Sequence, residues 1–371
     1  MKQENHPQIP VIRSSMPPYD EYIDEIRDIW ETRWLTNSGE KHRRLEATMC
    51  DYLGISDVSL FVNGHQALEA ALDVLDIKGE VITTPFTFAS TTQAIVHRGL
   101  TPVFCDICAD SYTIDASKIE ALITEKTSAI LPVHVFGNLC DWRVIDSIAE
   151  KYNLKVIYDA AHSFGMTDNG VCVGNIGHAT MFSLHATKVF HAIEGGALVF
   201  SDSANHKKCA QWRNFGMNTP EEINMVGTNA KMSEFSAAMG LCNLRYVDAE
   251  ITKRKAVSEK YRERLSGKSG IFLCDEKPGI RYNYGYFPIR ITPDVFGRTR
   301  NDVAEALLKG KITARKYFYP LTSTFRAYEG LFHIQETPVA EIVAAQILTL
   351  PLYADLEFED VNRICDIILG K

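Results

Sequence analysis

The sequence predicts an α/β protein with a mainly parallel sheet covered by helices on both faces, followed by a smaller α+β region. Between residues 59 and 158, short apolar runs alternate with helical segments, which is the pattern of parallel sheets. After about Tyr246 this alternation stops, and a long charged helix predicted at 248–265 leads into shorter elements. The expected divisions are an N-terminal arm at 1–40, a large domain at 41–245 and a small C-terminal domain at 246–371.

The composition is that of an ordinary globular protein and excludes several classes. The 371 residues suffice for two domains, and the net charge of −8 argues against general binding to nucleic acid or anionic membranes. No apolar run approaches the ~20 residues of a membrane span, and the N-terminus lacks a signal-peptide core. The nine cysteines follow no disulfide framework, which indicates free thiols and a cytoplasmic protein. No second CxxC or paired histidines accompany Cys105 and Cys108, so no metal site is expected.

The arm is proline-rich as far as Pro18 and is then predicted to form a short helix near 22–30 and a turn at 36–39. From Glu40 the apolar spacing becomes helical. Gly54 is expected to end that helix, because glycine readily adopts the left-handed conformation common at this position.

The large domain is predicted from apolar runs that end at turn residues. Strands are expected at 59–62, 80–83, 101–104, 128–133, 154–158, 181–184 and 197–200. Helices are expected at 65–75, 91–98 and 117–123, and after Asp141, whose side chain would cap a helix. In the small domain, a strand is expected at 284–291 and helices at 301–308, 338–348 and 359–369. Because open α/β sheets bind ligands beyond the carboxyl ends of their strands, polar residues there are candidate site residues.

Lys188 is the first such candidate. It lies between the strands predicted at 181–184 and 197–200, among apolar residues and shortly before Gly195. A buried ammonium costs several kcal/mol unless it is paired or neutralised. One way to avoid that cost is to form a Schiff base with a carbonyl compound. The alternative is a solvated lysine on a loop.

Asp159 is the strongest partner for Lys188, because it directly follows the apolar strand predicted at 154–158. The alternative is that Asp159 caps a helix beginning at 160–162. A lysine for the aldehyde and a carboxylate for the ring nitrogen are what pyridoxal phosphate requires. Such a carboxylate keeps the ring nitrogen protonated, and the charged hydrogen bond orients the ring.

Other residues fit the remaining parts of this cofactor. The turn at 63–66 precedes a helix, and amides at a helix N-terminus can bind a phosphate. Ser183 and Thr187 add hydroxyl donors, and His162 could face the phenolate oxygen. Phe88 could stack on the ring. The alternatives are a plain turn, a core histidine and ordinary core packing.

Six motifs in order resemble the DegT/DnrJ/EryC/StrS family of sugar aminotransferases, from about Ile9 to the C-terminal PLYADL. They are NGHQALEAAL at Asn63, TTPFTFASTTQAI at Thr83, VIYDAAHSFG at Val156, SLHATKVFHAIEGGA at Ser183, RNFGMN at Arg213 and GTNAKMSEFSAAMGL at Gly227. The resemblance implies a fold-type I aminotransferase with a mainly parallel seven-stranded sheet. It also implies pyridoxal 5′-phosphate as cofactor, which becomes pyridoxamine phosphate between the two half-reactions.

The activity implied by this resemblance is amino transfer from L-glutamate to a nucleotide-linked keto sugar. The HATK…EGG form is most similar to the viosamine-type branch that converts dTDP-4-keto-6-deoxy-D-glucose into dTDP-4-amino-4,6-dideoxy-D-glucose. Related sugar dehydratases carry histidine in place of Lys188, so the lysine argues against that chemistry. The alternatives are a 3-keto sugar nucleotide aminotransferase and a non-catalytic regulator that binds pyridoxal phosphate. A dinucleotide-dependent oxidoreductase is excluded for want of a GxGxxG after a strand.

Residue by residue, the resemblance makes Lys188 the Schiff-base lysine and Asp159 the partner of the ring nitrogen. His162 takes the position that contacts the phenolate oxygen, and Phe88 takes that of the stacking aromatic. The implied phosphate-binding residues are Gly64, His65, Ser183 and, from a neighbouring subunit, Asn229. This last assignment implies a homodimer with shared active sites.

Two departures from the family pattern concern anion contacts. His65 stands where the family usually has Thr or Ser, and Lys231 replaces a common Arg. The sugar nucleotide carries a diphosphate, so cations are expected near the cleft; the alternative for each is a solvated surface cation. The candidate substrate-binding residues are His185, Arg213, Lys231, Arg315 with the adjacent Lys316, and Tyr317.

Overall fold

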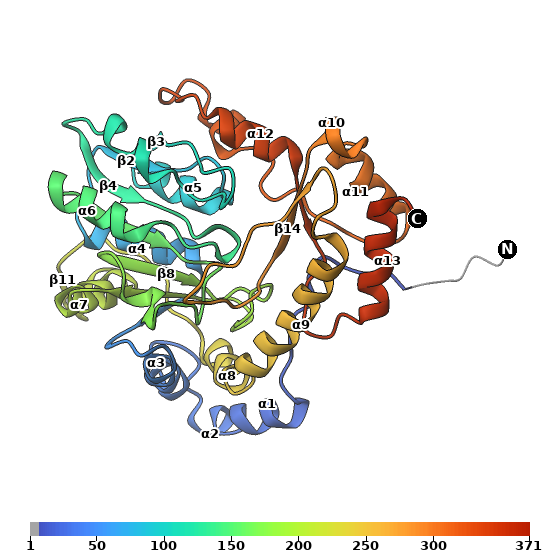
Figure 1. The fold of residues 1–371 in the computed structure, drawn as a ribbon. Helices are drawn as coiled ribbons and strands as arrows, with labels where there is room; N and C mark the ends of the chain where they lie inside the picture. The colour runs from blue at the N-terminus through green and yellow to red at the C-terminus, as the bar shows by residue number, and fades with distance from the viewer. Residues whose placement is uncertain (1–6) are drawn as a thin grey trace.

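The computed structural model describes residues 7–371, and a seven-stranded sheet forms the centre of its larger part (Figure 1). The strand order is β1-β9-β8-β5-β4-β2-β3. These strands are β1 (Ser59–Phe61), β2 (Glu80–Thr83), β3 (Thr101–Phe104), β4 (Thr127–Leu131), β5 (Lys155–Asp159), β8 (Ala179–Ser183) and β9 (Gly196–Phe200). The strands from β8 to β3 run parallel, whereas β9 is antiparallel to both β8 and β1. The expected mainly parallel seven-stranded sheet is confirmed.

Helices cover both faces of this sheet because successive strand residues point to opposite sides. In β5, Val156 and Tyr158 join the core on one face, whereas Ile157 joins the core on the other. The helices on the first face include α3 (Glu40–Leu53), α6 (Trp142–Tyr152) and α8 (Glu234–Leu244). Those on the second face are α4 (Gly64–Val74), α5 (Ala89–His97) and α7 (Ser203–Trp212).

The smaller C-terminal part surrounds a three-stranded antiparallel sheet in the order β12-β14-β15 (Figure 1). Its elements are α9 (Val247–Leu265), β12 (Ile271–Phe272), β14 (Phe287–Ile291), α10 (Pro293–Phe296), α11 (Arg300–Lys309), α12 (Pro338–Gln346), β15 (Ile347–Leu350) and α13 (Phe358–Leu369). Tyr261, Leu307 and Ile364 bring α9, α11 and α13 into one buried cluster with the sheet. The prediction of a smaller α+β part is confirmed.

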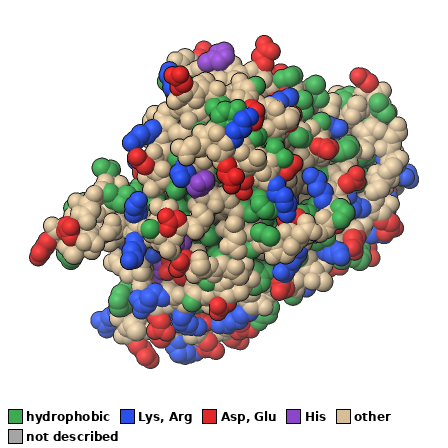
Figure 2. All heavy atoms as spheres, turned by 60° about the vertical axis from the view of Figure 1, so that its left-hand side comes forward, with side chains coloured by type: hydrophobic (Ala, Val, Ile, Leu, Met, Phe, Trp, Pro, Cys, Tyr) green, Lys and Arg blue, Asp and Glu red, His purple; other side chains and the backbone are tan. Residues whose placement is uncertain are grey.

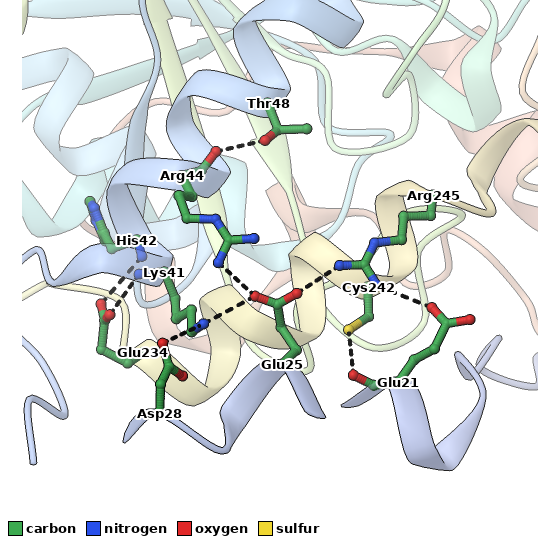
Figure 3. A network of polar contacts seen from close by, with 10 residues as sticks. All are labelled: Glu21, Glu25, Asp28, Lys41, His42, Arg44, Thr48, Glu234, Cys242 and Arg245. Atoms are coloured by element: carbon green, nitrogen blue, oxygen red, sulfur yellow. Dashed lines mark hydrogen bonds and ion pairs between the residues drawn. The ribbon is translucent and has the colours of Figure 1, made fainter. Parts of the chain in front are cut away.

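The N-terminal helices α1 (Tyr19–Ile26) and α2 (Ile29–Thr32) are tied to the large part by a network of charges (Figure 3). The buried carboxylate of Glu25 accepts from Lys41 Nζ at 3.2 Å, Arg44 Nη1 at 2.9 Å and Arg245 Nη2 at 2.6 Å. These cations come from α3 and from the C-terminus of α8. Three cations around one buried carboxylate fix α1 against both helices.

Several predicted elements are corrected by the structure. The helix expected at 117–123 is two short 3-10 turns, Ala116–Lys118 and Glu120–Leu122. The helix expected at 338–348 ends at Gln346, because the apolar residues that follow pair with β14 as β15. The strand expected from residue 284 begins only at Phe287.

The helix expected near 22–30 is divided into α1 and α2, and α8 was not predicted. Two smaller sheets complete the described fold. Their strands are β6 (Thr167–Asp168), β7 (Val171–Cys172), β10 (Met217–Thr219), β11 (Glu222–Ile223) and β13 (Ile280–Arg281). One sheet has the order β13-β6-β7, and the other is the hairpin β10-β11.

The surface and the cysteines agree with the composition. Figure 2 shows Lys and Arg side chains mixed with Asp and Glu over one face, with no broad area of a single sign. All nine cysteines are free. Among residues 7–371, no helix combines the length and the apolar character that crossing a bilayer demands.

Candidate active site

A cavity of about 450 Å³ lies where β2, β5 and β8 end. The large sheet contributes Asp159 and Ser183 from the last residues of two strands, and the loop after β8 contributes Lys188. The C-terminal part closes the cavity with Tyr286, Arg315, Tyr317 and Phe318. The carboxyl edge of a parallel sheet is where such folds bind ligands, so this cavity is the candidate active site.

Lys188 points its amine into this cavity from the loop between β8 and β9. Its Nζ donates to the hydroxyl of Tyr286 at 3.1 Å, and its backbone N–H donates to the carbonyl of His185 at 2.9 Å. The amine therefore has one fixed partner and no carboxylate salt bridge within residues 7–371. A lysine held this way is placed to react with a ligand in the cavity.

Asp159 presents a carboxylate that is only 5% exposed. Its Oδ2 accepts from Thr91 Oγ1 at 2.7 Å, and its Oδ1 accepts from the N–H of Ala161 at 3.1 Å. Burial raises the pKa of Asp159, while these two hydrogen bonds and the charge of Lys188 lower it. No helix follows Asp159, so the structure removes the helix-cap alternative. A cationic group on a ligand would stabilise this buried charge.

His162 is a neutral hydrogen-bond donor to the cavity. Burial, with a smaller effect from Lys188, holds the pKa of His162 well below its usual value. The N–H of Phe136 donates to His162 Nδ1 at 3.0 Å, so the proton of the neutral ring resides on Nε2. The ring of Phe318 stacks on His162 at 5.9 Å between centroids, with 7° between planes, and fixes its orientation.

The turn between β1 and α4 forms an anion cradle on one side of the cavity. Asn63 caps α4, since its Oδ1 accepts from the N–H of Gln66 at 2.9 Å, and Gly64, His65 and Ser183 line the cavity nearby. A Cβ at Gly196 would meet the carbonyl oxygen of Asn63 at 2.4 Å. Glycine at the start of β9 therefore allows the strand to lie directly against this turn. The helix N-terminus and its amides favour a negatively charged group.

The structure brings together most of the predicted site residues around one cavity. Gly64, His65, Phe88, Asp159, His162, Ser183, His185, Thr187, Lys188, Arg315 and Tyr317 all line it. Phe88 is 60% exposed at its rim. His185 Nδ1 lies 2.8 Å from Thr187 Oγ1 on the lysine loop.

Arg213 does not line the cavity, which corrects the expectation that it is one of the substrate-binding residues there. It is 7% exposed, and its Nη1 donates to Glu46 Oε1 at 3.0 Å and to the carbonyl of Leu60 at 2.7 Å. The guanidinium is committed to a buried ion pair beneath β1. Within this chain its contacts support β1.

Lys231 and Asn229 also lie outside the cavity of their own chain. Lys231 Nζ donates to Asn214 Oδ1 at 2.8 Å and lies 4.9 Å from the centroid of the Phe215 ring. Asn229 pairs with Asn214 in an isolated antiparallel bridge. Both residues therefore belong to the segment around β10 and β11, whose Phe215 is exposed.

Sequence reasoning missed Tyr286, Thr91 and Phe318. Tyr286 stands in a tyrosine-rich segment, YNYGY from Tyr282, whose composition was a usable signal. Thr91 lies within the motif at Thr83, but a single hydroxyl gives no sign that it meets a carboxylate. Phe318 reaches the cavity from the C-terminal part, a contact that only tertiary folding creates.

Comparisons with known proteins identify the family of this chain. Residues 19–369 match the model of the DegT/DnrJ/EryC1/StrS aminotransferase family. The chain is 42% identical to a dTDP-4-amino-4,6-dideoxy-D-glucose transaminase of Escherichia coli, over 99% of this chain and 100% of that protein. It is 40% identical to the transaminase of the same name in Shigella dysenteriae, over 96% and 97%.

Two solved structures share the whole fold. DesI, crystallised in the presence of its TDP-sugar product, has a TM-score of 0.93 and 31% identity over 98% of this chain and 92% of its own. The putative sugar aminotransferase Spr1654 of Streptococcus pneumoniae, in its PMP form, has a TM-score of 0.90 and 25% identity over 98% and 97%. The resemblance seen in the motifs is confirmed: this chain is an aminotransferase of the DegT/DnrJ/EryC1/StrS family.

Proposed function

We propose that this enzyme transfers the amino group of L-glutamate to dTDP-4-keto-6-deoxy-D-glucose, giving dTDP-4-amino-4,6-dideoxy-D-glucose, with pyridoxal 5′-phosphate as cofactor. The observation that carries the proposal is the meeting of Lys188, buried Asp159 and neutral His162 in one cavity. The choice of sugar rests on the 42% identity to the Escherichia coli transaminase.

The residues of the cavity fit this cofactor. The carboxylate of Asp159 would face the ring nitrogen, and Nε2 of His162 would donate to the phenolate oxygen. Phe88 offers an exposed aromatic face, and the α4 N-terminus with Gly64 and Ser183 would hold the phosphate. Bound there, pyridoxal phosphate would supply an aldehyde that accepts the amino group and a protonated ring that withdraws electrons from the reacting carbon.

The chain's own residues then move and hold protons. Asp159 keeps a proton on the ring nitrogen, because the buried carboxylate is stabilised by the positive charge beside it. Lys188 Nζ removes the proton from the α-carbon of L-glutamate. In the second half of the reaction it delivers a proton to the sugar carbon that carried the keto oxygen. The hydroxyl of Tyr286, 3.1 Å from Nζ, positions the amine for both transfers.

The cavity also offers contacts for the sugar nucleotide. Arg315 lines it beside Tyr317, and the guanidinium lies 5.9 Å from the Tyr317 ring. An arginine at this place suits a diphosphate, since its planar group donates two parallel hydrogen bonds. Lys316 is adjacent in the chain, and His185 faces Glu194 at the rim at 3.5 Å.

We also propose that two copies share their active sites, with Asn229 and Lys231 of one copy beside the cavity of the other. Three large apolar side chains of this region are exposed in the single chain: Phe215, Ile223 and Val226. Such a surface supports contact with a second copy. Since Asn229 lies outside its own cavity, the second copy is where its amide would find a phosphate.

The first experiment tests the chemistry at Lys188. Purified enzyme with pyridoxal phosphate is treated with borohydride, and the modified peptide is identified by mass spectrometry. We expect the borohydride label on Lys188. In a separate, untreated sample we expect release of 2-oxoglutarate from L-glutamate and the 4-keto sugar. Lys188→Ala should lose both, whereas Lys207→Ala, an exposed lysine on α7, should lose neither. Turnover by Lys188→Ala, or faster reaction with a 3-keto sugar nucleotide, would contradict the proposal.

A second experiment tests the shared sites. Lys188→Ala and Asn229→Ala chains, each impaired alone, are mixed under conditions that exchange subunits. If Asn229 serves the partner, each mixed dimer contains one intact site, and activity should return to about one quarter of the wild-type value. No recovery after confirmed exchange would place both residues in the site of one chain.

A further inference from the structure

Three metal-ligating side chains meet outside the reacting groups of the cavity, between α4 and α5. His65 and Glu69 are one turn apart on α4, and His97 is the last residue of α5. His65 Nε2 and His97 Nδ1 lie 3.3 Å and 3.0 Å from Glu69 Oε1, and the two ring nitrogens lie 3.5 Å apart. One ligand atom from each residue therefore lies within 4.8 Å of the other two, close enough for all three to bind one ion.

These distances match the coordination sphere of a zinc-type ion. Zinc binds imidazole nitrogen and carboxylate oxygen at about 2.0–2.1 Å with tetrahedral geometry, which places neighbouring ligand atoms about 3.3 Å apart. The three observed separations of 3.0, 3.3 and 3.5 Å lie on both sides of that value. The atoms form one face of a tetrahedron without any rearrangement of the helices.

A cation bound at the cluster would also compensate the charge of Glu69. The side chain of Glu69 is 8% exposed, and within residues 7–371 its ion-pair partners are the two histidines alone. A buried carboxylate is costly unless a positive charge compensates it. Imidazoles supply that charge only when protonated, whereas a divalent ion supplies it with both rings neutral.

The surrounding contacts leave the ligand atoms available. His65 Nδ1 lies 3.0 Å from Ser90 Oγ, so an N–H donated there leaves the lone pair of Nε2 for a metal. Gln66 Nε2 donates to Glu69 Oε2 at 2.9 Å, which leaves Oε1 for the same ion. Hydrogen bonds of this kind orient ligands in metal sites. The side chain of His97 is 58% exposed, so an ion and its fourth ligand, water, can enter from solvent.

We propose that His65, Glu69 and His97 bind one divalent transition-metal ion of the zinc class. Two nitrogen ligands and one oxygen favour such an ion over magnesium or calcium, which prefer oxygen. His65 and Ser90 also line the cavity, so the ion adds positive charge beside the anion cradle. Slower dissociation of the cofactor, whose phosphate group that cradle would hold, is the expected consequence. That consequence alone rests on the proposed function.

Cobalt(II) tests the site directly, because its visible spectrum reports the coordination geometry. The full chain, stripped with EDTA, is titrated with Co²⁺ by calorimetry and absorption, and Zn²⁺ is then added to compete. We expect one ion per chain with a tetrahedral spectrum that Zn²⁺ abolishes. His97→Ala should weaken binding at least 10-fold, the loss caused even by changes around the ligands of metal sites.

Glu69→Gln, which keeps the side-chain size, should weaken binding as well, and His333→Ala, an exposed histidine elsewhere, should bind as the wild type does. Absence of stoichiometric binding by the wild type would overturn the proposal. Unchanged affinity in His97→Ala, or a cobalt–sulfur absorption band that assigns the ion to cysteines, would overturn it too. Amino transfer is assayed separately on the stripped enzyme, so failure of the metal site leaves the proposed reaction untouched.

Discussion

Two buried carboxylates in this molecule, Glu25 and Asp159, differ in whether cations of the chain compensate their negative charge. Glu25 is surrounded by the cations Lys41, Arg44 and Arg245, so its charge is compensated within the chain (Figure 3). Asp159 accepts only from a hydroxyl and a backbone N–H, and no cation of residues 7–371 bonds to it. The first arrangement holds helices together, whereas the second leaves a charge to be compensated by a ligand. A buried charge that the chain leaves without a counter-ion is therefore the better sign of function.

Asp159→Asn should have the largest effect on activity of the two carboxylate substitutions. The amide fills the same space and can still accept from Thr91, but it cannot hold a proton on a ring nitrogen by charge. Turnover with L-glutamate and the keto sugar should fall by about 10²–10³-fold, as when a single electrostatic contact to a reacting centre is removed. Steady-state release of 2-oxoglutarate measures the loss. Thermal unfolding should show that Asp159→Asn remains folded. Near-normal turnover would contradict the assignment of Asp159 to function.

Glu25→Gln should instead reduce stability. Removing one partner of an isolated buried ion pair costs about 3–5 kcal/mol of unfolding free energy, and Glu25→Gln should cost less because Lys41 and Arg245 keep Asp28 and Glu21 as partners. Lys41 is the cation most affected, since its side chain is buried and keeps only Asp28, at 2.9 Å, as an ion-pair partner. Urea unfolding measures this loss, with exposed Glu31→Gln as the control. Turnover per folded molecule should not change, and a selective loss of turnover would contradict the assignment of Glu25 to structure alone.

Tyr286→Phe tests how the amine of Lys188 is positioned, because it removes only the hydroxyl that accepts from Lys188 Nζ. A hydrogen bond of this type contributes about 1 kcal/mol, so kcat should fall about 5-fold. KM for L-glutamate should stay the same if Tyr286 positions the amine without binding the substrate. A rise in KM at constant kcat would show instead that the hydroxyl binds substrate.

A further prediction concerns pH and a buried base. Burial lowers the pKa of His134 to about 3, and its Nδ1 accepts from the N–H of Cys140 at 3.1 Å. Below the unfolded-state pKa of about 6.5, the unfolded chain binds a proton that the folded chain does not, so stability falls as pH falls. His134→Gln should reduce that slope by up to about 1.4 kcal/mol per pH unit between pH 6 and 4. Urea unfolding across this range tests the sign, and an unchanged slope would contradict it.

The sequence predicted the part of the site that follows strands. Lys188 and Asp159 could be found because each lies just beyond an apolar run, where an α/β sheet binds ligands. Tyr286 and Phe318 could not, because they reach the cavity only after the C-terminal part packs against the large sheet. The limits of α12 and β15 were missed for a related reason: pairing with β14, a tertiary contact, decides where the helix ends. The cluster of His65, Glu69 and His97 likewise depends on the packing of two helices.

The hydrogen bond from the Phe136 backbone to His162 Nδ1 has a kinetic consequence. Charging this ring would require the loss of that bond and a cation in a dry environment next to Lys188. The pKa of this imidazole is held well below its usual value, so the ring stays neutral at a pH where an ordinary histidine already gains a proton. An acidic limb in the pH–rate profile has to be assigned to a group other than this imidazole.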